Sequence, residues 1–323
     1  MLAIRIEETG GPEVLKAVDV PVPEPGPGQV LVRHQAVGLN FIDTYHRTGL
    51  YPVRLPSGLG MEAAGTVEKV GEGVTRFAVG DPIAYASGPL GAYAEFHVTD
   101  PARAVKPPPG VDPKAAAAAL LKGMTTEFLV RRCFPLAAGQ TALIHAAAGG
   151  VGQILVQWAK HIGATVIATV GSHDKAAVAR RLGADHVILY REQDVAAEVR
   201  RLTGGRGVEV AYDSVGAATF EGTLASLARR GMFVSFGNAS GPAPAVEPLR
   251  LQRAGSVFLT RPTLFDYTSS PGELDESAGA LFDLISRGVI KVEIGQTFPL
   301  TKAADAHRAL ESRATVGATV LVP

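Results

Sequence analysis

Near its centre the chain reads Thr141-Ala-Leu-Ile-His-Ala-Ala-Ala-Gly-Gly-Val-Gly-Gln-Ile-Leu-Val-Gln-Trp-Ala-Lys160. An apolar run typical of a strand leads into a glycine-rich turn, and apolar residues at helical spacing follow it. Such a turn lets the backbone approach a pyrophosphate, which then meets the amide groups and the dipole of the helix. Gly149 and Gly152 keep two positions of the G-x-G-x-x-G pattern, whereas Ala147 stands at the first. Taken alone, the stretch fits a dinucleotide site and a tight turn without a ligand equally well.

Strand and helix patterns alternate after this turn. Strands are expected at residues 141–146, 165–170, 186–189, 208–212, 232–236 and 257–260. Helices are expected at residues 151–162, 175–182, 195–202 and 220–227. This alternation predicts an α/β fold of the Rossmann type, in which a doubly wound parallel sheet carries helices on both faces. A dinucleotide site at the glycine turn is then the favoured interpretation.

The first part of the chain has a different pattern. Short apolar or alternating runs occur at residues 2–7, 15–20, 30–37, 65–70, 82–85 and 93–98, and one helix is expected near 41–46. They predict a β-rich, barrel-like region. Two helices, one beginning at Asp112-Pro113 and one at 125–133, should lead to the central strand. A final strand at 318–322 is expected to return to the β-rich domain. We therefore expect a Rossmann domain of residues 123–262 inserted into a β-rich domain of residues 1–122 and 263–323.

Composition excludes several classes of protein. The 323 residues contain 31 basic and 31 acidic side chains, so the electrostatic footprint of a nucleic-acid-binding protein is absent. The single cysteine, Cys133, excludes an intrachain disulfide and a cysteine-rich zinc site. No apolar run reaches the roughly 18 residues of a membrane span. The composition predicts a cytoplasmic protein without a membrane segment.

The end of the second Rossmann strand indicates which dinucleotide binds. NAD-binding folds carry an acidic residue there for the ribose hydroxyls. Here Val170 ends the strand, small Gly171 and Ser172 follow, and Lys175 supplies a cation. This pattern favours NADP, because it leaves room and charge for a 2′-phosphate. The alternative for Lys175 is a solvated lysine. Tyr190, after the third strand, is expected near the adenosine or else on the surface.

A second group of polar residues lies between a predicted strand and helix. It contains Asn40, Asp43, Tyr45 and His46, and its amide and hydroxyl groups suit a carbonyl or a ribose. Helix capping and ordinary packing are the alternative roles. Glu62 follows in an apolar neighbourhood and needs a partner if it is buried. We expect that partner to come from Arg54 or from the helix after Asn40.

Six motifs along the chain resemble the medium-chain dehydrogenase/reductase superfamily, and specifically its zinc-free quinone oxidoreductase (zeta-crystallin-like) branch. They are Asn40-Phe-Ile-Asp-Thr-Tyr45, Gly58-Leu-Gly-Met-Glu62, His145–Gly152, Tyr212-Asp-Ser-Val-Gly216, Val234-Ser-Phe-Gly-Asn238 and Glu311-Ser-Arg-Ala-Thr315. Together they are most similar to bacterial NADPH:quinone reductases. The resemblance implies that the β-rich domain is GroES-like. It also implies that no zinc binds, because Asn40 and Met61 stand where zinc-dependent relatives have cysteine and histidine.

The resemblance further implies which residues form the site. Asn40, Tyr45 and Tyr51 would hold the nicotinamide and the quinone. The residues implied for NADPH are Asn40, Phe128, Gly149, Gly150, Val151, Gly171, Ser172, Lys175, Tyr190, Ser214, Phe236, Gly237, Asn238, Arg261, Pro262 and Arg313. Phe128 stands where some relatives have tyrosine, and without the motif Arg313 would be a solvated residue after a helix. His145 is expected to pack rather than to act as a base.

The leading interpretation is an NADPH:quinone reductase that transfers hydride to a quinone substrate. A second interpretation is a reductase of α,β-unsaturated ketones or aldehydes, with Tyr45 as proton donor. A third is a non-catalytic RNA-binding or crystallin-like protein, against which the neutral charge argues. An exposed apolar edge strand at residues 257–260 predicts a homodimer, since such an edge needs covering.

Overall fold

The computed structural model describes residues 1–323, which fold into two compact units. The first unit consists of Met1–Met124, Thr268–Ser286 and Val292–Pro323. The second consists of Thr125–Tyr267 and Arg287–Lys291. The chain thus leaves the first unit, builds the second and returns. Each unit is described by itself.

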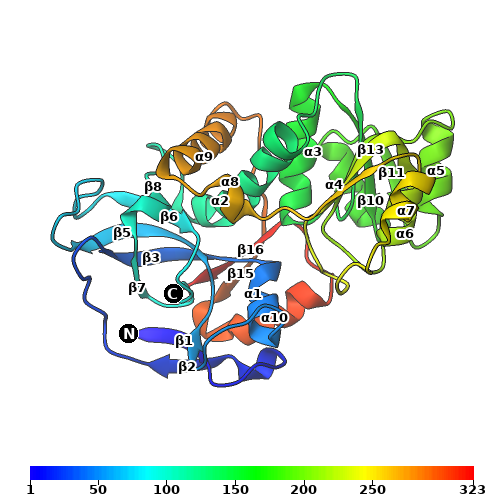
Figure 1. Ribbon diagram of the computed structural model, residues 1–323. Helices are drawn as coiled ribbons and strands as arrows, with labels where there is room; N and C mark the ends of the chain where they lie inside the picture. Colours follow the sequence, from blue (N-terminus) through cyan, green and yellow to red (C-terminus); the bar gives the residue numbers. More distant parts are fainter. The chain divides into compact units, whose positions relative to one another are not determined.

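The second unit is built around a six-stranded parallel sheet (Figure 1). Its strand order is β11-β10-β9-β12-β13-β14, so the order reverses between β9 and β12, where doubly wound sheets bind their ligands. The strands are β9 (Thr141–Ile144), β10 (Thr165–Val170), β11 (His186–Leu189), β12 (Val208–Asp213), β13 (Leu227–Ser235) and β14 (Phe258–Thr260). The helices are α3 (Gly150–Ile162), α4 (His173–Arg181), α5 (Val195–Leu202), α6 (Phe220–Ser226), α7 (Pro248–Arg253) and α8 (Leu264–Tyr267). The predicted Rossmann fold is confirmed.

Burial explains why these strands are almost wholly apolar. Helices cover both faces of a parallel sheet, so successive side chains along its central strands are removed from water. Leu143, Ile167 and Phe233 are at most 1% exposed, and the rings of Phe233 and Phe220 lie 5.1 Å apart. Each such side chain contributes about 1.5–3 kcal/mol through burial. The resulting rigid sheet holds the loops at its carboxyl edge.

The first unit contains two sheets. A seven-stranded sheet has the order β15-β16-β3-β5-β6-β8, with β7 also paired to β3, and a three-stranded sheet has the order β2-β1-β4. Strand β16, from the C-terminal segment, pairs antiparallel with β3, so the end of the chain completes the β-rich unit as expected. The strands are β1 (Leu2–Ile6), β2 (Lys16–Asp19), β3 (Val30–Leu39), β4 (Ser57–Gly58), β5 (Glu62–Val70), β6 (Pro82–Ala86), β7 (Phe96–Thr99), β8 (Ala104–Val105), β15 (Ile294–Pro299) and β16 (Ala318–Val322). The helices are η1 (Pro12–Val14), α1 (Phe41–Thr48), η2 (Pro101–Arg103), α9 (Pro271–Ser286), η4 (Leu300–Lys302) and α10 (Ala303–Glu311).

One helix replaces the two predicted before the central strand. Helix α2 runs from Pro113 to Phe128 and continues in a π-helical segment, η3 (Leu129–Cys133). Asp112 caps its start as expected, because its carboxylate accepts the amide of Lys114 at 2.7 Å. The expected separation into two helices is wrong: α2 continues through Gly123, against which the side chain of Leu281 packs directly. Tertiary packing therefore offsets the low helix propensity of glycine.

Buried histidines in the first unit predict acid sensitivity. Burial lowers the pKa of His34 to about 3, that of His97 to about 4 and that of His307 to about 3. The pKa of each histidine is lower in the folded protein than in the unfolded chain, so the unfolded chain binds protons more readily. Each histidine therefore contributes stability above about pH 6.5, and that stability is lost as pH falls. Burial raises the pKa of Asp43 to about 7, which acts in the opposite direction between pH 7 and 4. The destabilisation from the three histidines exceeds the stabilisation from Asp43 as pH falls.

We therefore expect the free energy of unfolding to fall by roughly 5 kcal/mol between pH 6.5 and pH 4. Urea unfolding followed by circular dichroism at several pH values measures it. The variant His97→Phe keeps a ring against Tyr85, which now lies 5.8 Å from the imidazole, and removes one titrating group. Its stability should depend less steeply on pH. Identical pH dependence in the variant and the wild type would contradict the assignment of His97.

Candidate functional site

The glycine turn joins β9 to α3 in the second unit. Ala146 takes the left-handed backbone conformation, with a φ of 51°, and its carbonyl accepts the amide of Gly149 at 2.9 Å. A Cβ on Gly152 would overlap that carbonyl and lie 2.8 Å from the Cα of Ala147. Glycine is therefore required at 152 for the helix to approach the strand. Alanine is accepted at 147 because the residue of this turn that takes the left-handed conformation is Ala146 and not Ala147.

The start of α3 has the features of an anion site. Gly149 is the N-cap residue, no side chain caps the helix, and the first turn carries no acidic residue. The amides of Gly150 and Val151 therefore meet no side-chain acceptor from a cap. Unmet amides and the positive end of the helix dipole favour a phosphate at this position. The turn consequently fits the pyrophosphate of a dinucleotide.

His145 packs beneath this turn in a buried polar network. Its Nδ1 lies 3.0 Å from the hydroxyl of Thr169, and its Nε2 lies 2.9 Å from that of Thr223. Thr223 in turn donates to Asp213 at 2.9 Å, and burial lowers the pKa of His145. The ring is thus held on both nitrogens inside the protein, which agrees with a packing role. Sequence reasoning missed Asp213 and Thr223, since only the fold brings them to the turn.

A pair of cations lies at the ends of β10 and β11. Burial, and then the charge of Arg191, lower the pKa of Lys175. Gly171 provides a close approach, because a Cβ there would lie 2.5 Å from the hydroxyl of Tyr190 and 3.4 Å from Nε of Arg191. Ser172 caps α4 by accepting the amide of Lys175 at 3.4 Å. Two facing cations repel one another, and a bound anion relieves that repulsion. Arg191 was not predicted, although it directly follows Tyr190.

The remaining candidates of the second unit follow the strands beyond the order reversal. Ser214 accepts the amide of Ala239 at 3.2 Å through its carbonyl, so the loops after β12 and β13 lie together. Arg261 reaches back from the end of β14 and donates to the carbonyl of Ser235 at 3.1 Å. Because the strands are parallel, these loops share the sheet edge with the glycine turn. The predicted residues placed at this edge are Ser214, Phe236, Gly237, Asn238, Arg261 and Pro262.

Phe128 has a different environment from these residues. It is 1% exposed, and its ring stacks face to face on Tyr267 with centroids 4.4 Å apart. Arg132 donates to the carbonyl of Tyr267 at 2.6 Å and strengthens the same contact. The structure therefore gives Phe128 a packing partner that the sequence did not predict.

The predicted catalytic residues of the first unit surround α1. Asn40 is its N-cap residue, and Tyr45 lies within it. Tyr51 follows the helix, and its ring meets that of Tyr45 edge to face with centroids 5.3 Å apart. The amide of Tyr51 also donates to the carbonyl of Tyr45 at 3.0 Å. The structure thus brings the two tyrosines together.

Glu62 is buried beside Asn40 and has partners that the sequence did not predict. It is 0% exposed and accepts from Asn40 Nδ2 at 2.7 Å, from the amide of Leu121 at 2.7 Å and from Lys122 Nζ at 3.1 Å. Helix α2 therefore supplies the cation, and the expectation of Arg54 is wrong. A partner 60 residues away cannot be found from local pattern.

A further buried network holds the other side of α1. Asp43 accepts from the amide of Asn40 at 2.9 Å and from the hydroxyl of Tyr93 at 3.0 Å. Tyr93 is 3.0 Å from Nε2 of His307, in α10. Arg313, the remaining candidate of this unit, lies just beyond α10 with a φ of 58°. These contacts fix the helix that carries Asn40 and Tyr45.

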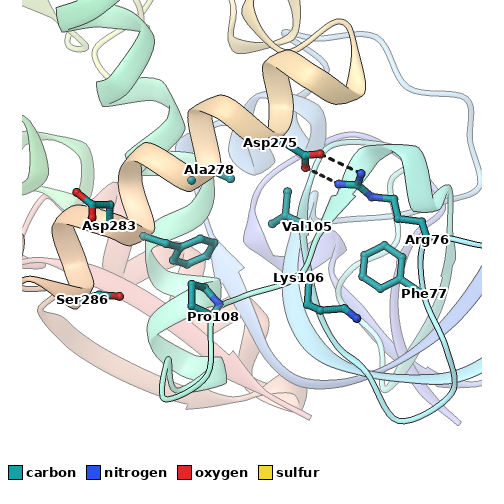
Figure 2. Close-up of a pocket in the computed structure, with 11 residues that line it drawn as sticks. Arg76, Phe77, Val105, Lys106, Pro108, Asp275, Ala278, Asp283 and Ser286 are labelled. Carbon is teal, nitrogen blue, oxygen red and sulfur yellow. Dashed lines mark hydrogen bonds and ion pairs between the residues drawn. The ribbon is translucent and has the colours of Figure 1, made fainter.

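A groove of about 590 Å³ lies between α9 and the β-rich sheet of the first unit. Figure 2 shows Arg76 reaching Asp275 on α9, with the ring of Phe77 beside Lys106. No predicted site residue lines this groove. It is separate from the candidate residues around α1.

Two features are absent from the structure. No group of three or more histidine, cysteine, aspartate or glutamate side chains is arranged to hold a metal ion. No helix has both the length and the apolar character needed to cross a membrane.

Comparison with known proteins shows similarity along the whole chain. The family model of the alcohol dehydrogenase GroES-like domain matches residues 26–109, and that of zinc-binding dehydrogenases matches residues 150–274. A quinone oxidoreductase of Pseudomonas aeruginosa is 52% identical over 321 residues, which cover 99% of each chain. A 2-haloacrylate reductase of a Burkholderia species is 44% identical, and the match spans all of this chain and 99% of that protein. The crystal structure of Escherichia coli quinone oxidoreductase complexed with NADPH has a TM-score of 0.98 at 46% identity, with full coverage of both chains.

Proposed function

Because the chain belongs to the quinone oxidoreductase family of medium-chain dehydrogenases/reductases, we propose that it is an NADPH-dependent quinone oxidoreductase. The observation that carries this proposal is 52% identity, over nearly the whole chain, to a quinone oxidoreductase. The uncapped start of α3 and the facing cations Lys175 and Arg191 support the phosphate-rich cofactor independently. NADPH, when bound, supplies the hydride.

The residues proposed for the cofactor divide into three groups by the part they would hold. Gly149, Gly150 and Val151 hold the pyrophosphate at the start of α3. The adenosine end is held by Gly171, Ser172, Lys175, Tyr190, Arg191 and Arg313. The nicotinamide half is held by Asn40, Phe128, Ser214, Phe236, Gly237, Asn238, Arg261 and Pro262.

The protein's own part in the reaction is to bind and orient the quinone and to stabilise charge on its oxygen. Tyr45 and Tyr51 offer ring faces and hydroxyl groups, and Tyr45 donates a hydrogen bond where negative charge develops. Asn40 lies beside them at the start of α1. No metal ion is proposed, because an amide at 40 and a thioether at 61 are poor ligands for zinc. The catalytic residues are therefore Asn40, Tyr45 and Tyr51.

A substrate panel tests this proposal. We expect rapid NADPH oxidation with 1,4-benzoquinone and substituted quinones, and slow oxidation with alkenals. NADH serves as the control and should react slowly with every substrate. Equal rates with NADH, or no quinone-dependent oxidation, would overturn the proposal.

The second candidate is reduction of an α,β-unsaturated acid, ketone or aldehyde. The 44% identity to a 2-haloacrylate reductase favours it specifically. Tyr45 would then donate the proton that completes the reduced substrate. Faster NADPH oxidation with 2-chloroacrylate or an alkenal than with any quinone would select this activity. A non-catalytic RNA-binding role would instead appear as submicromolar, NADPH-sensitive binding of AU-rich RNA.

We also propose a homodimer formed through β14. This strand is an edge of the parallel sheet, and its Phe258 is 56% exposed. Exposed apolar edges invite pairing, and a second copy supplies a matching strand. We expect light scattering to give about twice the chain mass of 33.6 kDa, and the variant Phe258→Lys to shift the protein to the monomer mass. A wild type at the monomer mass would contradict the dimer.

A further inference from the structure

Glu62 is a buried carboxylate held by three donors from two elements. The amide of Leu121 and the ammonium of Lys122 approach it from α2, and the side-chain nitrogen of Asn40 approaches it at 2.7 Å. A Cβ on Gly38 would overlap the carboxylate, so the backbone of β3 also makes room for it. An ion pair this deeply buried gains little net stability, since desolvation opposes the attraction. Its retention is better explained by what it fixes.

What it fixes is the side-chain amide of Asn40. A carboxylate only accepts hydrogen bonds, so the nitrogen of this amide must face Glu62. The same nitrogen lies 3.5 Å from the carbonyl oxygen of Gly38. That oxygen accepts the second hydrogen of the NH₂ group. Asp43 holds the backbone amide of Asn40 from the other side at 2.9 Å. The amide oxygen faces the backbone N–H of Asp43 in the capping box of α1. It has two lone pairs, so its second acceptor position is the part of this side chain left to meet a ligand.

We infer that Glu62 and Lys122 are positioning residues that turn the amide oxygen of Asn40 toward the bound cofactor. This inference rests on the proposed function and deepens it. An amide oxygen accepts hydrogen bonds and therefore needs an N–H or O–H donor. A 1,4-quinone offers only acceptor oxygens, whereas NADPH carries ribose hydroxyls and a carboxamide. Asn40 consequently serves NADPH, and Tyr45 remains the donor for the quinone oxygen.

The test reverses the hydrogen-bond polarity around residue 40. In the double variant Lys122→Met/Glu62→Gln, the oxygen of the new side chain accepts the amide of Leu121. Its NH₂ group then faces Asn40, whose amide must turn its oxygen inward. We expect the dissociation constant of NADPH, measured by its fluorescence, to rise about 10-fold, which corresponds to one hydrogen bond. The KM for 1,4-benzoquinone should change less than about 3-fold, because Tyr45 is untouched.

Adding Asn40→Asp to the double variant and to the wild type should change the dissociation constant of NADPH in opposite directions. In the double variant, one carboxylate oxygen at position 40 accepts from the glutamine and the other faces the ligand. NADPH binding should return to within about 3-fold of the wild type. In the wild-type background the same change places a second carboxylate against that of Glu62, whose oxygen now lies 2.7 Å from the Asn40 nitrogen. The two negative charges repel, so the dissociation constant of NADPH should rise more than about 10-fold. A purely structural role for Glu62 produces no such reversal.

Circular dichroism and thermal unfolding serve as the controls that each variant folds. If Asn40→Asp weakens NADPH binding in both backgrounds, or the double variant binds like the wild type, the inference is overturned while the proposed function stands. If the wild type itself binds no NADPH, the proposed function fails. The two failures are thus distinguished by the wild-type titration.

Discussion

Replacing Gly152 with alanine is expected to weaken NADPH binding by more than about 100-fold. The new methyl group would overlap the carbonyl oxygen of Ala146 and lie 2.8 Å from the Cα of Ala147. Both atoms belong to the backbone, so no side-chain rotation relieves the overlap. The start of α3 must move away from β9, and the amides that would meet the pyrophosphate move with it. Fluorescence titration with NADPH measures the loss.

Gly279→Ala is the matched control for this variant. Gly279 also lies inside a helix, α9, but an added Cβ meets no atom within 4 Å. We expect unchanged NADPH affinity and a gain in stability of about 0.5–1 kcal/mol, because alanine has the higher helix propensity. An NADPH affinity in Gly152→Ala equal to that of the wild type would show that the turn is only a connection between strand and helix.

Replacing Lys175 with alanine is expected to weaken NADPH binding by roughly 10-fold to 100-fold and to leave NADH binding nearly unchanged. A hydrogen bond from an ammonium to a phosphate contributes about 1.5–3 kcal/mol, and NADH lacks that phosphate. Burial, and then the charge of Arg191, lower the pKa of Lys175, so both cations contribute positive charge to this end of the site. Arg191→Ala should therefore reduce NADPH affinity in the same selective way.

NADH is the internal control for both cation variants. Increasing salt should weaken NADPH binding in the wild type more than in the variants, because fewer charges remain to be screened. Equal losses for NADPH and NADH would place Lys175 away from the phosphate. Unchanged NADPH affinity in both single variants would contradict the assignment of Lys175 and Arg191 to the 2′-phosphate.

The local pattern of the sequence predicts the fold of the second unit well. Strand, glycine turn and helix follow one another without interruption, and the buried centre of each later strand is apolar because both faces of the sheet are covered. The exception at Ala147 is explained by structure, since Ala146 takes the left-handed conformation. Asp112 at the start of α2 also follows from local rules, as a short polar side chain before proline.

Contacts between distant segments could not be predicted. The continuity of α2 through Gly123 depends on Leu281, far along the chain, which packs against that glycine. The partner of Glu62 is Lys122, because the fold and not the spacing brings α2 to β5. Arg191 is a candidate because it follows β11 and its charge lowers the pKa of Lys175, which no local pattern indicates. Buried polar partners are set by tertiary structure, which periodicity does not encode.

The role of Asn40 shows how geometry refines a residue assignment. The sequence allows its amide to donate to a quinone oxygen or to accept from a cofactor. The contact of its nitrogen with Glu62 at 2.7 Å leaves the second role.

The most direct test of the account is the initial rate of NADPH oxidation by 1,4-benzoquinone with protein that has been dialysed against a chelator. We predict a rate proportional to protein concentration, unchanged by chelation and at least about 10-fold lower with NADH, in line with one charged contact. No protein-dependent oxidation, or a rate abolished by chelation and restored by zinc, would contradict an NADPH-dependent, metal-free quinone reductase.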